Sequence, residues 1–168
     1  VLAGISTGTL TGYSSSIAYI SIYVIMNLGV FGCIFLMKKD GEYCEDIQDL
    51  AGISKQNPLL AISFLIIMFS LAGIPPLAGF FAKFYVFMSV IESGMYTLAI
   101  VGLLSTVISA FYYLRIIKII YFDEIKNPFD QIKNFGTTST VFLTCTMLVF
   151  FFLYPSILNN IVNILSIN

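Results

Sequence analysis

The sequence contains no histidine, and its three cysteines, Cys33, Cys44 and Cys145, show no Cys-x-x-Cys spacing. Common zinc and haem sites are built from clustered cysteine and histidine ligands, so no metal site is expected in this chain. The isolated cysteines give no basis for a disulfide framework either. The sequence therefore predicts a chain that binds no metal or cofactor of its own.

Charged residues are also scarce, at 10% of the chain, and the net charge is only −1. A nucleic-acid surface needs a basic patch, so no nucleic-acid partner is expected. Hydrophobic residues make up 58% of the 168 positions, which leaves too little polar surface to cover a soluble globule. The chain opens on Val1 and lacks a signal-peptide pattern. We expect an integral membrane segment of a larger protein, in contact with lipid.

Four apolar segments are candidates to cross the membrane, judged against the ~20 residues that a helix needs to span ~30 Å of hydrocarbon. They are Ile17–Met37, Leu59–Ile91, Tyr96–Tyr121 and Thr137–Tyr154. The second would reach about 50 Å as one straight helix, so it is predicted to be broken, tilted or both. Pro155 either ends the fourth helix or kinks it, and the apolar spacing up to Leu165 would continue it or form an interfacial helix. The predicted fold is all-α, a single membrane segment with about four transmembrane helices, the second discontinuous.

The basic residues sort to one side of these spans. Lys38, Lys39 and Lys55 precede the second span, and a further set lies between the third and fourth: Arg115, Lys118, Lys126 and Lys133. Lysine and arginine are retained on the side of insertion, so both connections are predicted to face the cytoplasm or matrix. The C-terminus then faces the opposite side. Lys83 is the one basic residue that does not follow this sorting.

The second span contains the stretch SLAGIPPLAGFFAKFYVF at residues 70–87 and is preceded by a helix-start signal, Asn57-Pro58. Proline removes a backbone donor and crowds the preceding turn, so a helix break is predicted here. In lipid, such a break is tolerated where protein or water satisfies the freed backbone groups. The residues assigned to the break or hinge are Gly73, Ile74, Pro75, Pro76 and Gly79.

Lys83 is the candidate functional residue of this stretch. Pro76, Gly79 and Lys83 are spaced i, i+3 and i+7, which predicts one shared face of the second half-helix, with Gly79 keeping a groove clear toward the lysine. Apolar walls are expected from Phe80, Phe84 and Phe87. A charged lysine at a helix centre costs ~2.5–3.5 kcal/mol, so hydration or a nearby acid can switch its protonation, as a proton relay requires.

The alternative is that Lys83 snorkels to the membrane surface, since it lies only about 12 Å along the helix from Ile91. Glu92 is expected at the head groups, with a second interpretation as a proton exit. The predicted spans contain no other acid, so a counter-charge for Lys83 must come from elsewhere. Gly29 and Gly32 are expected to serve helix packing.

Three stretches together resemble one known family. They are EDIQDLAGISKQNP at 45–58, FSLAGIPPLAGFFAKFYVF at 69–87 and SAFYYLRIIKIIYF at 109–122. Their sequence and order are similar to those of the antiporter-like, proton-pumping subunits of respiratory complex I (NADH:ubiquinone oxidoreductase). Within that family the resemblance favours subunit 2 of the plant, algal and protist mitochondrial type.

The resemblance implies the C-terminal part of a fourteen-helix antiporter-like fold, built from two inverted repeats that each contain a broken helix. The four spans would be its last four, with Leu59–Ile91 the discontinuous twelfth helix and Lys83 the protonatable lysine of the second half-channel. It implies other complex I membrane-arm subunits as partners, which would hold NADH, FMN, iron–sulfur clusters and ubiquinone. It also implies the mitochondrial inner membrane, with the basic loops in the matrix and the C-terminus in the intermembrane space.

The first ten helices of that fold are absent from this sequence. Either a companion chain supplies them or the chain is a fragment of a longer parent. Two other functions stay open. One is a cation/proton antiporter subunit of the same superfamily, and the other is a purely structural or assembly subunit of the membrane arm.

Overall fold

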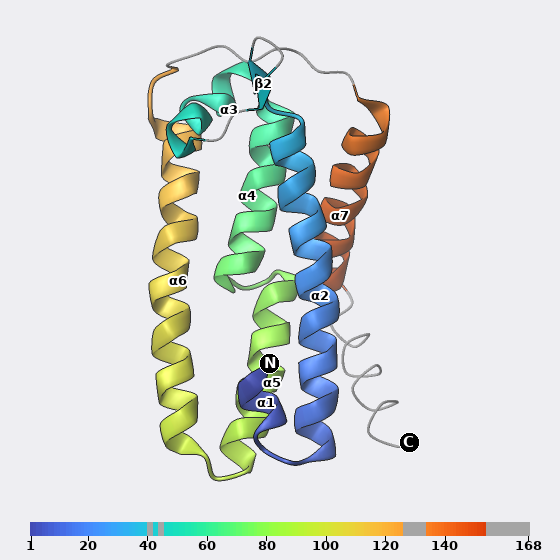
Figure 1. Cartoon of the computed structure of the whole chain (residues 1–168), viewed down its shortest axis with the longest axis vertical. Helices are drawn as coiled ribbons and strands as arrows, with labels where there is room; N and C mark the ends of the chain where they lie inside the picture. Colours follow the sequence, from blue (N-terminus) through green and yellow to red (C-terminus); the bar gives the residue numbers. More distant parts are fainter. Residues whose placement is uncertain (40–41, 44–45, 126–133, 154–168) are drawn as a thin grey trace.

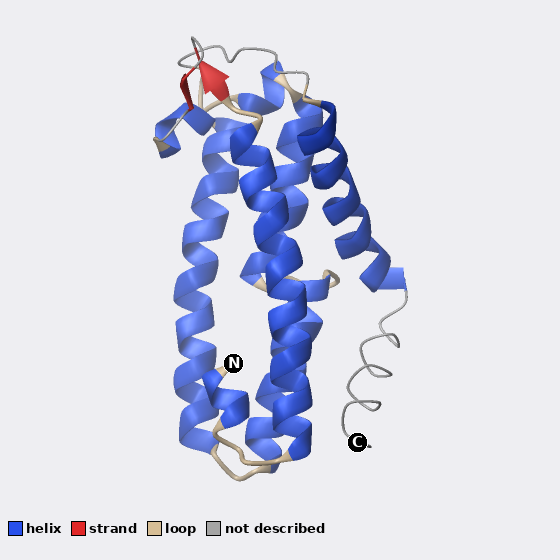
Figure 2. Ribbon diagram, turned by 45° about the vertical axis from the view of Figure 1, so that its right-hand side comes forward, coloured by secondary structure: helices blue, strands red, loops and turns tan. Residues whose placement is uncertain are grey.

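The computed structural model describes residues 1–39, 42–43, 46–125 and 134–153 as an elongated bundle of helices (Figure 1). The elements are α1 (Leu2–Ile5), α2 (Leu10–Phe35), β1 (Lys38–Lys39), β2 (Glu42–Tyr43), the 3-10 helix η1 (Ile47–Leu50), α3 (Ile53–Gln56), α4 (Pro58–Ala72), α5 (Ala78–Glu92), α6 (Tyr96–Phe122) and α7 (Phe135–Leu153). The two short strands form an antiparallel pair at one end of the bundle (Figure 2).

By length and composition, α2 and α6 are long and apolar enough to cross a membrane, and α4 and α7 are shorter apolar helices. The predicted second span corresponds to two helices, α4 and α5, separated by residues 73–77. Tyr154, Pro155 and the proposed extension to Leu165 lie outside the described residues, as do Lys126, Lys133 and the C-terminus.

The first long helix begins at Leu10, whereas the sequence predicted Ile17. Thr9 caps it, because its Oγ1 accepts a hydrogen bond from Gly12 N at 3.1 Å. The hydroxyls of Ser14 and Ser15 donate to carbonyls one turn back, at 2.8 and 2.6 Å. Serines bonded in this way are accommodated in a helix, so the polar stretch before Ile17 belongs to α2.

The predicted start signal Asn57-Pro58 is confirmed. Pro58 occupies the first turn of α4, and Asn57 Oδ1 accepts a hydrogen bond from Leu60 N at 3.2 Å. Proline suits this position because its missing N–H would have no partner inside the helix.

Replacing Asn57 with alanine should lower the stability of the assembled protein by about 1 kcal/mol, because an N-cap acceptor is lost. The measurement is the thermal unfolding midpoint of the purified, detergent-solubilised assembly. Asn57→Ser keeps an acceptor and is the matched control. Equal midpoints for the two variants would contradict the capping role.

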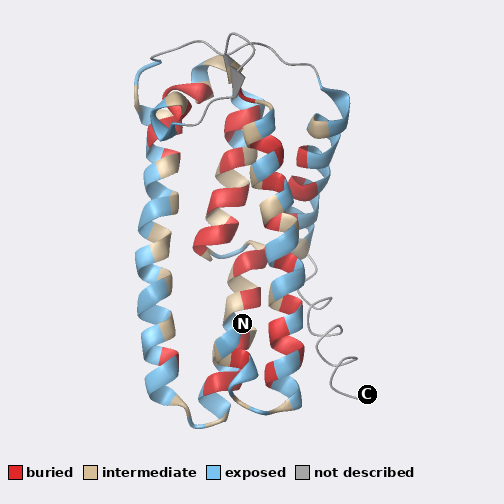
Figure 3. Ribbon diagram, in the orientation of Figure 1, coloured by how far each residue is buried: buried red, intermediate tan, exposed pale blue. Residues whose placement is uncertain are grey.

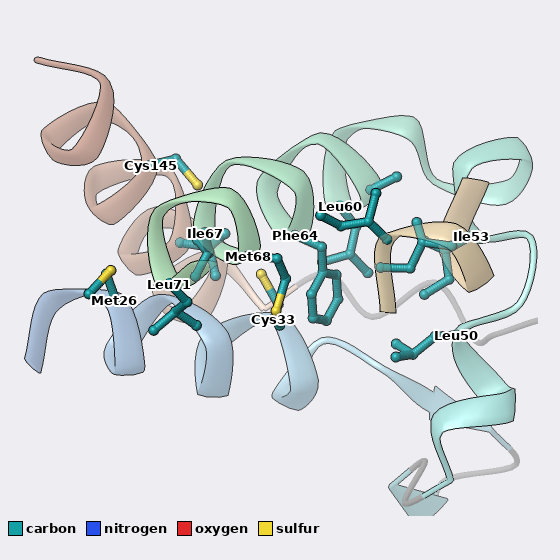
Figure 4. Close-up of a cluster of buried hydrophobic side chains, with 14 of the residues drawn as sticks. Met26, Cys33, Leu50, Ile53, Leu60, Phe64, Ile67, Met68, Leu71 and Cys145 are labelled. Atoms are coloured by element: carbon teal, nitrogen blue, oxygen red, sulfur yellow. The ribbon is translucent and has the colours of Figure 1, made fainter. Parts of the chain in front are cut away.

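The core lies where α2 packs against α4 and α7. Its side chains include Met26, Cys33, Phe64, Ile67 and Cys145, which come together from these three helices (Figure 4).

Two glycines of α2 confirm the packing role that the sequence predicted for them. A Cβ on Gly29 would lie 2.8 Å from Ile67 Cδ1 and 2.9 Å from Thr144 Oγ1, and one on Gly32 would lie 2.7 Å from Val141 Cγ2. Both positions therefore bring α2 close to its neighbours, as small residues do between membrane helices.

Helix α6 is the least covered of the long helices (Figure 3). Its buried residues lie near its two ends, at Ala99, Ile117, Ile119 and Ile120. Between them, large apolar side chains such as Val107 and Phe111 are 67% and 65% exposed. An apolar face of this length calls for lipid or further protein against it.

The connection that carries β1 and α3 lies at the same end of the bundle as the last turns of α6 (Figure 1). Lys38, Lys55, Arg115 and Lys118 therefore belong to one end, and the turn after Glu92 belongs to the other. The side of the membrane that each end faces stays a prediction.

Candidate functional site

The candidate site is the break between α4 and α5, which lies near mid-height of the bundle (Figure 1). Helix α4 ends at Ala72, and Gly73 follows with φ +81° in the left-handed region that favours glycine. Gly73 N donates to Phe69 O and Ser70 O at 3.1 and 3.0 Å, and Ile74 N donates to Phe69 O at 3.0 Å. These bonds close the last turn of α4 and stop the helix.

Helix α5 resumes at Ala78, so the break comprises residues 73–77. Pro75 and Pro76 lie in this turn and are exposed. The prediction that Pro76 shares a helical face with Lys83 is therefore wrong. Leu77, the N-cap of α5, has an extended backbone with ψ 161°. Pro76 therefore lies outside the helix, and its direction does not follow the helical periodicity of α5.

Gly79 also has a different role from the predicted one, because it belongs to the first turn of α5 and is buried against α4. Its amide donates to Ser70 Oγ at 3.1 Å. A Cβ at this position would overlap the Ser70 carbonyl oxygen and lie 2.7 Å from the Ser70 carbonyl carbon. Gly79 thus permits close contact between the two half-helices, and the prediction that it keeps a groove open is wrong.

Lys83 lies one turn further along α5, and its side chain reaches back across the break. Its Nζ donates to Leu71 O at 2.8 Å and to Ala72 O at 3.2 Å. A helix leaves its last four carbonyls without partners inside the helix, and its C-terminus carries partial negative charge. The ammonium group therefore binds two unpaired carbonyls of α4 and lies at the negative end of its dipole.

This arrangement settles where Lys83 points. The sequence left open whether the side chain snorkels toward the membrane surface beyond Ile91, and the structure directs it to the break instead. Its ammonium is bonded to backbone carbonyls there, and the counter-charge that the sequence leaves to other parts of the protein stays a prediction.

Gly73 ends α4 and also leaves room for the side chain of Lys83. A Cβ on Gly73 would lie 3.0 Å from Lys83 Cδ and 3.2 Å from Lys83 Nζ. The lysine side chain therefore runs directly over this glycine. A larger residue at position 73 would displace the lysine and strain the backbone at once.

Two cavities flank Lys83. The first, of about 300 Å³, has the predicted apolar walls of Phe80, Phe84 and Phe87, and Ala72, Gly73, Met88, Ile91, Leu103 and Thr106 complete its lining. The second, of about 200 Å³, is lined by Val1, Ala3, Tyr19, Val86, Phe87, Gly102, Ser105 and Thr106 beside the lysine. The two cavities share Phe87 and Thr106, and the second adds the hydroxyl groups of Tyr19 and Ser105.

Glu92 is not brought together with Lys83. It is the exposed last residue of α5, and nine positions at 100° each place it on the opposite side of that helix. Among the described residues that line the two cavities, none is acidic. Glu92 as a proton exit stays a prediction without direct geometric support.

Sequence reasoning missed Ser70, Tyr19 and Thr106. Ser70 is 0% exposed and accepts the Gly79 amide, and the other two residues line the cavities. The available signal was a serine three residues before Gly73 in an apolar helix. That signal is weak, because a helical serine bonds its own helix as readily as a neighbour.

Residues 1–109 match the family described as "NADH:quinone oxidoreductase/Mrp antiporter, TM", and they contain the break and Lys83. The chain belongs to this family. The predicted resemblance to the antiporter-like membrane subunits of complex I is thereby confirmed.

Two bacterial relatives in this family carry the name NADH-quinone oxidoreductase subunit N. The one from Pelagibacter ubique is 54% identical over 166 residues, which cover 99% of this chain and 35% of the relative. The one from Rhodospirillum rubrum is 50% identical over 158 residues, covering 93% and 32%. The chain therefore spans about a third of the length of these relatives.

Two solved structures, both titled respiratory complex I from Thermus thermophilus, contain similar chains. The structure with bound aureothin matches at a TM-score of 0.74 and 26% identity over 88% of this chain and 34% of that chain. The structure with bound NADH matches at 0.79 over 98% of this chain and 34% of that chain, and at 20% identity it shows a shared fold alone. The plant, algal and protist mitochondrial type stays a prediction.

Proposed function

We propose that this chain is the C-terminal part of a proton-translocating membrane-arm subunit of an NADH:quinone oxidoreductase, and that Lys83 is its proton-relay group. The observation that carries the proposal is the position of Lys83. Its ammonium lies at a helix break, bonded to Leu71 O and Ala72 O and flanked by two cavities. The relatives' name, NADH-quinone oxidoreductase subunit N, supplies the reaction.

The geometry supports a proton relay because the strength of the hydrogen bonds between Lys83 and the two carbonyls depends on the charge of the lysine. Charge-assisted hydrogen bonds are about twice as strong as neutral ones, and the α4 dipole favours a cation at this end. When Lys83 loses its proton, the neutral amine keeps two N–H donors but loses this electrostatic attraction. A released amine can then turn toward either cavity and take up another proton there.

The break and hinge residues of the proposal are Gly73, Ile74, Pro75 and Pro76. The break at these residues leaves the carbonyls of Leu71 and Ala72 free to accept from Lys83, whereas an unbroken helix would keep them for its own amides. Gly79 is not part of this set because it belongs to the first turn of α5 and packs against Ser70 of α4.

We further propose that NADH, FMN, iron–sulfur clusters and ubiquinone are bound by partner subunits and that a companion chain or parent sequence supplies the first ten helices. The exposed apolar face of α6 supports contact with lipid or with such further helices. The proposed location is the mitochondrial inner membrane, with the basic end in the matrix and the C-terminus in the intermembrane space.

A second candidate is a subunit of a cation/proton antiporter, because the family description names both kinds of protein. Affinity purification of the tagged chain from its native membrane distinguishes the two. We expect flavin- and iron–sulfur-containing subunits to co-purify, together with a membrane chain or segment that completes the fold. Recovery of small membrane chains alone, without a flavin subunit, would instead establish the antiporter.

A further inference from the structure

We infer that Ser70 is the positioning residue for Lys83: its hydroxyl fixes the first turn of α5 on the last turn of α4 and thereby aims the lysine at the break. The inference rests on the proposed function, because it assigns to Ser70 a part in proton transfer at Lys83. The Ser70 side chain itself lines neither of the two cavities beside Lys83.

The first observation is a buried hydrogen bond across the break. Ser70 is 0% exposed, and its Oγ accepts from Gly79 N at 3.1 Å. The amides of a first helical turn have no acceptor inside their own helix, so a partner must come from outside. Here the partner comes from the preceding half-helix, and one polar bond joins α4 to α5.

The second observation is the close backbone approach at the same place. The backbone of Gly79 lies so close to Ser70 that a Cβ on residue 79 would be 3.0 Å from Ser70 Oγ and would overlap Ser70 O. A hydrogen bond and a close contact between the same two residues restrict both the separation and the rotation of α5 relative to α4.

The third observation is the register. Gly79 and Lys83 are separated by one helical turn and share a face of α5, while Ser70, Leu71 and Ala72 are consecutive at the end of α4. The side chain of a helical residue leans toward the N-terminus of its own helix, which for Lys83 is toward α4. Once Ser70 holds Gly79, the lysine is therefore aimed at Leu71 O and Ala72 O, at 2.8 and 3.2 Å.

A buried serine could also serve the stability of α4 alone, and the two roles predict different results. If Ser70 acts through Lys83, its loss changes proton transfer in protein that has assembled. If it serves stability alone, its loss changes the amount of assembled protein and leaves the protons moved per NADH unchanged.

The test uses the complete membrane complex in sealed vesicles, with protons translocated per NADH oxidised as the readout. We expect Ser70→Ala to lower this ratio, but by less than Lys83→Ala does, because the lysine is kept while the loss of one buried hydrogen bond shifts a two-state population roughly five-fold. Ser63→Ala is the matched control, since Ser63 lies on the same helix and its hydroxyl donates within it, to Leu59 O at 2.9 Å. The control should keep the wild-type ratio.

A second measurement uses the wild-type complex, so it does not depend on the assembly of a variant. Hydrogen–deuterium exchange of the unmodified complex should show the Gly79 amide protected, although it belongs to a first helical turn. Rapid exchange of that amide would overturn the inference. The inference would also be overturned if assembled Ser70→Ala complex moved the wild-type number of protons per NADH while Lys83→Ala complex moved fewer. A wild-type ratio in Lys83→Ala itself would overturn the proposed function.

Discussion

Lys83→Ala is expected to remove most of the proton translocation that passes through this subunit while NADH oxidation by the complex continues. A positioned acid–base group contributes ~10²–10⁴-fold to a proton-transfer step, so transfer at this site should slow by at least about 100-fold. The measurement is the rate of proton uptake or release in sealed vesicles at a matched rate of NADH oxidation.

Lys83→Ala also leaves Leu71 O and Ala72 O without their donors, so a loss of activity could follow from a disturbed break. Lys83→Arg separates the two effects. Arginine keeps the charge and several donors for the carbonyls but does not release its proton in proteins. We therefore expect normal assembly and lost translocation in Lys83→Arg.

Lys118→Ala is the control for removal of a lysine as such, because Lys118 is exposed on α6 and lines neither cavity. It should translocate protons normally. Normal translocation in both Lys83 variants, with impaired assembly on changes at Gly73 or Pro75, would replace the relay by a purely structural role for this subunit.

Gly79→Ala is expected to have the largest effect on assembly. Helix propensity alone would favour alanine by ~1 kcal/mol in α5. Against this, the added Cβ overlaps a backbone carbonyl of Ser70, which cannot move without displacing the end of α4. Overpacking of a filled core costs about 1–3 kcal/mol or more, so the clash outweighs the gain.

The measurement is the amount of intact complex in solubilised membranes, together with its thermal unfolding midpoint. Gly136→Ala is the matched control, because among the described residues a Cβ on this exposed glycine of α7 meets Asn134 Oδ1 alone, at an ordinary 3.6 Å. That variant should assemble as the wild type does. If Gly79→Ala assembled equally well, the close contact between α4 and α5 would be refuted.

Several features of this protein follow from local sequence alone. Asn57-Pro58 starts α4 because a capping acceptor and a proline at the first helical position act within one turn. The stretch around Gly73 and Pro75 interrupts the helix because a left-handed glycine and missing donors are properties of the residues themselves. The apolar wall of Phe80, Phe84 and Phe87 follows from helical spacing on α5.

Other features were decided by the tertiary structure. A glycine in a helix is compatible with an open groove or with a tight contact, and only the packing of α5 on Ser70 shows that Gly79 makes the contact. The early start of α2 depended on which acceptors the hydroxyls of Ser14 and Ser15 would find. Polar groups with several possible partners leave such choices open in the sequence.

The sequence by itself determined that an apolar chain is broken beside a lysine, because proline, glycine and charge act through their own chemistry. Only the tertiary structure decided what the lysine binds. The carbonyls of Leu71 and Ala72 come within reach of Lys83 through the relative placement of two half-helices, and that placement depends on packing across the break. No property of residue 83 or its neighbours in sequence specifies that distance.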